Sequence, residues 1–233
     1  MPAAVAKKQV NESSFNRMIV AGCAMALLGA WLGFLCLLGQ IPAVFTDEAQ
    51  FAVYSEEHLD SVGVPFEAHF FKGAVASSKD WEQKRVQLFS PTTQRVELSD
   101  ADLNAWFNAG FRPAFNTASQ QPFQFYPRQP NIYISERVVY LSIPIDVSIW
   151  GSKKKWVLFA SGSFVGEGNP QFKVDSLYLN NAPFPFAGAF GSSVLNALVN
   201  VFRGAEDYQS LVEAWGRIES IEIESNRMQI QLR

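Results

Sequence analysis

The feature that most constrains this chain is a run of 29 residues, Met18 to Thr46, without a single acidic, basic or histidine side chain. Its first part, Met18–Leu38, is almost wholly apolar and has no polar face, unlike a helix on the surface of a soluble domain. As an α-helix it would measure about 31 Å, which matches the ~30 Å hydrocarbon core of a bilayer. We therefore expect one transmembrane helix over residues 18–40.

The charges on the two sides of this run differ sharply. Residues 1–17 hold three basic residues and one acidic residue, whereas residues 46–60 hold five acidic residues and no Lys or Arg. Lys and Arg favour the cytoplasmic side of a membrane span. The pattern predicts a single-pass protein of the inner (cytoplasmic) membrane, with residues 1–17 as a cytoplasmic tail and the remainder on the periplasmic side.

Two processed forms are the alternatives to a retained anchor. A signal peptide has a shorter apolar region and ends at small residues, whereas the side chains of Ile41–Phe45 are too large for a good cleavage site. Val20–Cys23 spells a lipoprotein-like box, but the apolar run continues beyond the cysteine. Gly29 and Gly33 form a G-x-x-x-G pattern that permits helix pairing, so the oligomeric state stays open.

Composition argues against several classes of function. The net charge of −3 does not suit a nucleic-acid partner, which would require a concentrated cationic surface. Both cysteines, Cys23 and Cys36, lie in the apolar run, so the outer domain has no thiolate for zinc and no disulfide. Neither histidine, His58 or His69, has a nucleophile motif beside it. We expect a protein that is not an enzyme and has no metal or cofactor.

Residues 138–150 carry the clearest strand pattern, because apolar residues from Val139 to Ile149 alternate with more polar ones. Turn residues at 151–154 and 166–170 predict two further strands, Trp156–Val165 and Phe172–Leu179, in an antiparallel meander. Pro144 lacks an N–H group, which suggests an edge position or a bulge in the first strand.

Helical spacing follows this meander. Pro183–Phe186 leads into a helix over Ala189–Phe202, whose apolar stripe covers most of its circumference. The remaining elements that we expect are strands at 96–98 and 132–135, a helix at 100–108 capped by Ser99, a helix at 206–215 and a terminal hairpin around Ser225-Asn226.

Residues 96–233 resemble the YpmS-like family of membrane-anchored bacterial proteins. The resemblance is carried by Leu98–Ala105, the long strands of 138–179, the Pro-Phe-Pro-Phe step and the terminal hairpin. It implies a curved antiparallel sheet that grips a helix, similar to tubular lipid-binding folds, with an apolar groove between them and no catalytic residues. The expected fold is therefore α+β: an N-terminal transmembrane helix, a connecting region at 41–96, and a β-rich domain at 97–233 whose curved antiparallel sheet packs on one or two helices.

The helix 189–202 could serve as core, as the wall of a ligand groove or as a docking face for a partner. If it lines a groove, we expect the binding residues to be Phe184, Phe186, Phe190, Val194, Leu198 and Phe202. Two functions follow: a tethered module that binds lipid or another apolar ligand, or a structural or assembly protein of the cell envelope that contacts partner proteins through this helix or a strand near Pro144. Lys153–Lys155 would keep a hairpin tip soluble or contact anionic lipid head groups.

Overall fold

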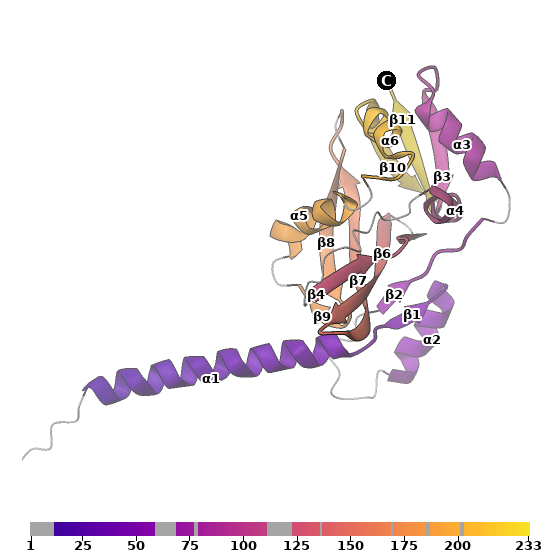
Figure 1. Cartoon of the computed structure of the whole chain (residues 1–233). Helices are drawn as coiled ribbons and strands as arrows, with labels where there is room; N and C mark the ends of the chain where they lie inside the picture. The colour runs from indigo at the N-terminus through magenta and orange to yellow at the C-terminus, as the bar shows by residue number, and fades with distance from the viewer. Residues whose placement is uncertain are drawn as a thin grey trace, which may run out of the picture.

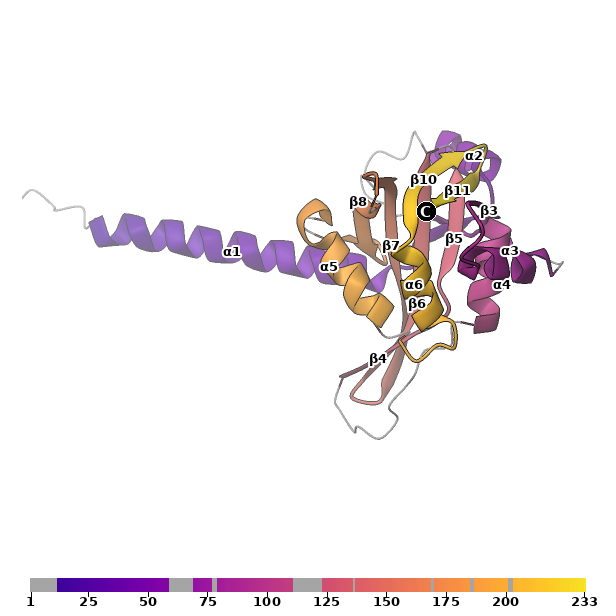
Figure 2. The same cartoon turned by 90° about the horizontal axis from the view of Figure 1, so that it is seen from above.

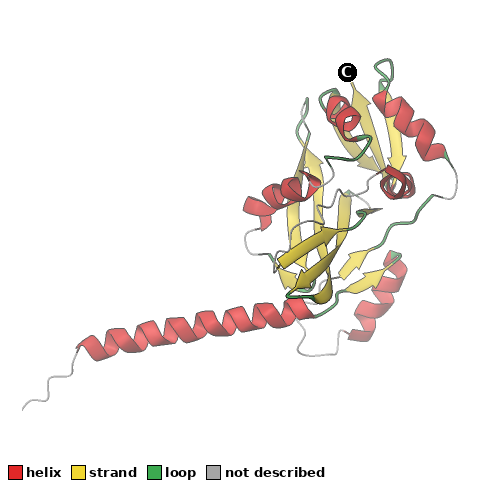
Figure 3. Cartoon of the chain, viewed as in Figure 1, coloured by secondary structure: helices red, strands yellow, loops and turns green. Residues whose placement is uncertain are grey.

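The structure, a computed structural model, describes residues 12–58, 69–76, 79–110, 123–135, 137–168, 170–184, 187–200 and 203–233. One long helix projects from a domain that combines several sheets with short helices (Figures 1 and 3). The class is α+β, as expected, and the sheets are mostly antiparallel, curved and not closed into a barrel.

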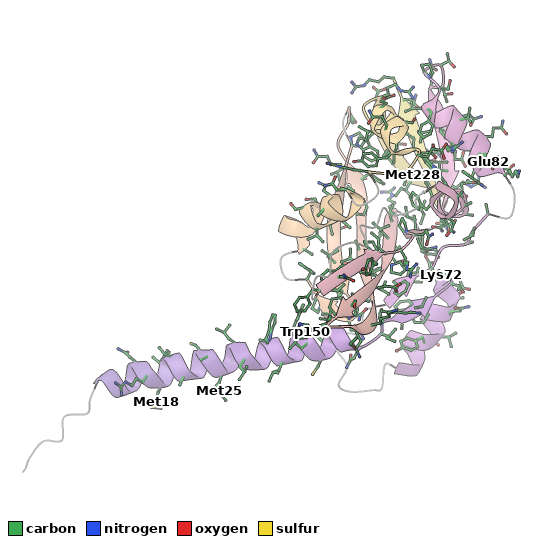
Figure 4. The ribbon with its side chains drawn as sticks, viewed as in Figure 1. Met18, Met25, Lys72, Glu82, Trp150 and Met228 are labelled. Atoms are coloured by element: carbon green, nitrogen blue, oxygen red, sulfur yellow. The ribbon has the colours of Figure 1, made fainter. Side chains whose placement is uncertain are left out.

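The projecting helix is α1 (Glu12–Gly39). Its segment Phe15–Gly39 has a mean hydropathy of 2.2, and none of its most apolar window is buried within the molecule. The helix is therefore long and apolar enough to cross a membrane, and its apolar surface is not used to build a core. In Figure 4 the side chains of Met18 and Met25 project from α1 far from the domain.

The main sheet has the strand order β4-β6-β7-β8-β9, and β5 also pairs with β6. Its strands are β4 (Phe123–Pro127), β5 (Asn131–Ser135), β6 (Val138–Ile149), β7 (Ser152–Val165), β8 (Gln171–Leu179) and β9 (Ala182–Pro183). All of its pairs are antiparallel, which confirms the predicted meander of β6, β7 and β8. The alternation along β6 is confirmed too, because its odd-numbered residues from Val139 to Val147 face the two hydrophobic cores.

The prediction that Pro144 marks an edge strand or a bulge was wrong. β6 has β7 on one side and both β4 and β5 on the other, so Pro144 lies within an internal strand. Its carbonyl accepts a hydrogen bond from the Arg128 backbone N–H at 2.7 Å, in the short connection between β4 and β5. The missing N–H of Pro144 thus falls where the partner of β6 changes from β4 to β5, which explains why an internal strand tolerates proline here.

The predicted turn at 151–154 was also placed wrongly. The turn consists of Trp150 and Gly151, whose φ angles are 44° and 83°, and β7 begins at Ser152. Two-residue hairpin turns of type I′ have positive φ at both central positions, and Gly151 supplies one of them without strain. Lys153–Lys155 therefore belong to β7 beside the turn and not to the turn itself.

A second sheet has the order β10-β11-β3. It is formed by β10 (Ile218–Glu224), β11 (Arg227–Leu232) and β3 (Arg95–Ser99), which confirms the predicted terminal hairpin and the short strand before residue 100. The helices α3 (Asp80–Phe89), α4 (Asp100–Gly110) and α6 (Tyr208–Trp215) pack with this sheet around one core.

Ser99 caps α4 as predicted, because its hydroxyl accepts the Asp102 N–H at 3.2 Å. The other predicted helix start was wrong: α6 begins at Tyr208, and Asp207 is buried before it. The Asp207 carboxylate accepts hydrogen bonds from the Trp106 indole N–H at 2.8 Å and from Arg85 at 2.9 Å. This carboxylate ties the start of α6 to the buried Trp106 of α4 and to the half-buried Arg85 of α3.

The segment expected to be a connecting region packs against the main sheet. β1 (Ala43–Phe45) and β2 (His69–Phe71) form a parallel pair, and α2 (Glu48–His58) lies beside them. The Phe71 ring lies 4.9 Å from that of Tyr133 and 5.2 Å from that of Tyr140, between ring centroids. These elements cover one face of the sheet with aromatic side chains, and α5 (Ala187–Val199) lies on the other face (Figure 1).

The last turn of α1 is joined to the domain by Asn180, between β8 and β9. The side-chain amide of Asn180 donates a hydrogen bond to the Leu38 carbonyl at 2.7 Å. Its oxygen accepts the backbone N–H of Val157 on β7 at 2.8 Å. Asn180 itself has a φ of 52°, a conformation that asparagine adopts more readily than most residues. The Asn180 side chain thus bonds both to the end of α1 and to the main sheet.

Candidate functional site

An apolar groove runs between α5 and the main sheet. It is a shallow depression, widely open to solvent, with a volume of about 350 Å³. Its lining residues come from β4, β6, β7, β8 and α5 and from the segment after β9, and they are Phe125, Ile145, Trp156, Leu158, Leu179, Phe184, Val194 and Ala197. None of these side chains carries a charge, so the groove can bind a ligand only by covering apolar surface.

The sheet side of the groove follows from strand alternation. Ile145 on β6 lies opposite Trp156 on β7, and Leu158 lies opposite Leu179 on β8. Residues that oppose one another in an antiparallel sheet project from the same face, and residues two apart along a strand do the same. Phe125 on β4 joins this face, and its ring centroid lies 6.1 Å from that of Trp156. The groove floor is therefore the continuation of the apolar core face.

The helix side depends on how closely α5 approaches β8. A Cβ atom added to Gly191 would lie 2.8 Å from a Val174 methyl carbon, so only glycine allows the α5 backbone to sit this near. Leu195, one turn further on, is buried in the same core. Val194 and Ala197 are three residues apart on the flank of α5 and face the groove. α5 thus has one side in the core and another along the groove.

Phe184 is positioned by the strand edge that precedes α5. Its backbone N–H donates to the Leu177 carbonyl of β8 at 2.8 Å, which extends the pairing beyond β9. The ring is half-buried and packs against the core cluster of the main sheet.

Of the six residues expected from the sequence, Phe184 and Val194 line the groove together. Phe186 and Phe202 fall outside the residues that the structure describes, as do the side chains of Phe190 and Leu198 within α5. Sequence analysis missed the groove residues on the sheet, although the alternation in β6 had already placed Ile145 on its apolar face.

A second hollow, of about 400 Å³, lies between β7 and β10. Arg137, Glu222 and Glu224 are among its lining residues, so opposite charges face the same space. A hollow lined in this way offers neither a continuous apolar surface nor a concentrated charge. The groove beside α5 is therefore the better candidate for a binding site.

The buried carboxylates near α4 have a structural role. Asp102 receives hydrogen bonds from Lys84 Nζ at 2.6 Å and from the Ser99 hydroxyl at 2.7 Å. Burial alone would raise the pKa of Asp102, but these hydrogen bonds and the Lys84 charge lower it. Burial raises the pKa of the neighbouring Asp100. Within the described part of the chain, no three His, Cys, Asp or Glu side chains gather as a metal site.

Comparison with known proteins adds no relative from which a role could be transferred. No protein-family model matches this chain, and neither does any curated protein sequence. The resemblance of residues 96–233 to the YpmS-like family therefore stays an expectation from the sequence. The groove has to be interpreted from its own geometry.

Proposed function

We propose that this protein is a membrane-tethered, non-enzymatic module that binds the acyl chain of a lipid, or another apolar ligand, beside the membrane. The observation that carries the proposal is the α5 groove, which is shallow and open to solvent and whose lining residues, among those that the structure describes, are all apolar. It belongs to a domain that is joined directly to a helix of membrane-spanning length.

The groove is suited to a chain-like apolar ligand. Its volume of about 350 Å³ falls at the lower end of the range of small-molecule sites. Each methylene group that moves from water into such a site contributes about 0.8 kcal/mol, so eight methylenes would contribute roughly 6 kcal/mol before ordering costs. Binding would depend on buried apolar area and would change little with salt.

The anchor places this groove where such ligands are concentrated. We propose that α1 is retained as a single span with the N-terminus in the cytoplasm, because basic residues precede it and acidic residues follow it. The domain would then lie at the outer surface of the cytoplasmic membrane, within reach of its lipids. Delivery of a ligand would need no diffusion through water.

Photocrosslinking of the full-length protein tests this function. The protein is reconstituted in nanodiscs that contain a phospholipid with a diazirine in its acyl chain, and the labelled peptides are mapped by mass spectrometry. We expect labelling of β4, β7 and α5 in addition to α1. Ala197→Trp fills the groove and should reduce labelling of the domain at least about threefold, since bulk in a site displaces its ligand.

Val212→Trp is the matched control, because Val212 is an exposed residue of α6 and lies outside the groove. This variant should label like the unsubstituted protein. Labelling confined to α1 in every variant would contradict a lipid-binding groove. Crosslinking of α5 to a stoichiometric protein partner would instead favour the alternative, an assembly protein of the cell envelope.

A further inference from the structure

We infer that the β6–β7 turn and the start of β4 form a membrane-contact surface that inserts into the headgroup layer of an anionic leaflet. This surface, called the tip here, consists of Phe123, Trp150 and Lys153–Lys155. The inference rests on α1 as the anchor but not on the groove as a lipid site. Its partner is the outer leaflet of the membrane that α1 crosses.

The tip exposes large aromatic side chains. Trp150 is 79% exposed and Phe123 is 45% exposed, and their ring centroids lie 5.2 Å apart. Trp150 also adopts a φ of 44°, which is unfavourable for a bulky residue and which Asn or Gly would adopt at lower cost. Trp150 contacts Phe123 but is not part of either hydrophobic core, so its large exposed ring favours a contact outside the domain. Tryptophan is enriched at the boundary between head groups and acyl chains.

The charge beside these rings has the sign that an anionic surface attracts. Lys153, Lys154 and Lys155 are all exposed at the start of β7. Asp146, which lies on β6 opposite Lys155, is ion-paired with Arg128, whose Nε donates a hydrogen bond to its carboxylate at 2.8 Å. Several adjacent lysines near a leaflet of acidic lipids add their attractions, and their apolar stems can lie along it.

The joint with α1 directs the tip toward the membrane. Asn180 fixes the last turn of α1 against β7, so the domain has a defined orientation relative to the anchor. In both views α5 lies on the side of the domain from which α1 projects (Figures 1 and 2). Trp150 is drawn at the level where α1 meets the domain (Figure 4). A membrane crossed by α1 would therefore lie next to the tip.

The tip is continuous with the apolar groove. Phe123 and Phe125 are two residues apart on β4, and Lys154 and Trp156 are two residues apart on β7. Each pair shares one face of the sheet, and the inner member of each pair lines the groove. Insertion of the tip would thus bring the entrance of the groove to the membrane surface, with Lys154 near the phosphates.

Depth-dependent quenching in vesicles tests this inference with the full chain. Cys23 and Cys36 are replaced by serine, and a single environment-sensitive fluorophore is attached through Ser152→Cys at the tip or through Val86→Cys on α3. Both positions are exposed. The vesicles contain phosphatidylcholine alone or with phosphatidylglycerol, and a lipid brominated near the head group acts as quencher. We expect at least about threefold stronger quenching at position 152 in the anionic vesicles.

Two further variants separate the contributions of ring and charge. Trp150→Ser should reduce quenching at position 152 in both kinds of vesicle. Lys153→Gln, Lys154→Gln and Lys155→Gln together should remove the difference in quenching between anionic vesicles and phosphatidylcholine vesicles. Thermal unfolding checks that each variant folds. Equal quenching at 152 and 86 would overturn the membrane contact, and quenching at 152 that is independent of lipid charge would overturn its anionic preference.

The two proposals can fail separately. Strong quenching at position 152 without photolabelling of the groove would support the membrane contact of the tip and overturn the lipid-binding function. Photolabelling of the groove without quenching at position 152 would support the lipid-binding function and overturn the membrane contact of the tip.

Discussion

At the scale of single residues, Asp102 is the charged group whose environment is best defined. It is buried at the start of α4, between Lys84 and the Ser99 cap. Replacing it with asparagine should lower the free energy of unfolding by about 1–3 kcal/mol at pH 7, because hydrogen bonds to an ionised group are lost. Urea denaturation measures the loss. Asp175→Asn, at an exposed position on β8, is the control and should have no effect.

The pH dependence of this effect has a definite sign. The pKa of Asp102 is lower in the folded protein than its ordinary value, because the bonds from Lys84 and Ser99 outweigh the effect of burial. Its stabilising contribution is therefore complete at neutral pH and is lost as the pH falls below about 4. Asp100 has the opposite effect on the pH dependence of stability, because burial raises its pKa and its charged form is therefore disfavoured in the folded protein. The difference between the unsubstituted protein and Asp102→Asn should shrink in acid; a constant difference from pH 7 to 3 would contradict this assignment.

At the scale of elements, the contact between α5 and β8 holds the groove in shape. Gly191→Ala would place a methyl group 2.8 Å from a Val174 carbon. Overpacking of this kind costs about 1–3 kcal/mol, and it should also push α5 away from the groove floor. Val174→Ala in the same chain should recover part of the loss. Gly188→Ala is the matched control, because no atom of the described residues lies within 4 Å of its added Cβ, and alanine favours a helix.

The elements also show what could be predicted from the sequence. β6 was predictable because alternation is a local property of Val139–Ile149. The internal place of Pro144 was not, because it depends on β4 and β5 both pairing along the same side of β6. Phe184 and Val194 could be expected in a groove from their neighbourhood in the chain. Trp156 and Leu179 could not, because the face of the sheet that α5 would approach depends on long-range packing.

At the scale of the whole molecule, the Asn180 side chain joins the end of α1 to the main sheet. Asn180→Gly keeps the positive φ but removes the side-chain bonds to Leu38 and Val157. Spin labels on the native Cys36 of α1 and on Ser152→Cys should then show a broader distance distribution in electron paramagnetic resonance. The Cys23 thiol is replaced by serine in every sample, and a distribution as narrow as that with Asn180 intact would contradict a joint held by this amide.

With α1 as the membrane span proposed above, a stiff joint at Asn180 would make the orientation of the domain depend on bilayer thickness. Spans that exceed the local hydrocarbon thickness accommodate it by tilting. Because α1 ends in a bonded contact and not in a slack linker, its tilt would be passed on to the sheet as a rotation of the same size. In a thinner bilayer, one edge of the domain would move toward the membrane surface and the opposite edge would move away from it. Lipid composition would thereby control how closely the apolar groove beside α5 faces the acyl chains of the membrane, without any change inside the domain.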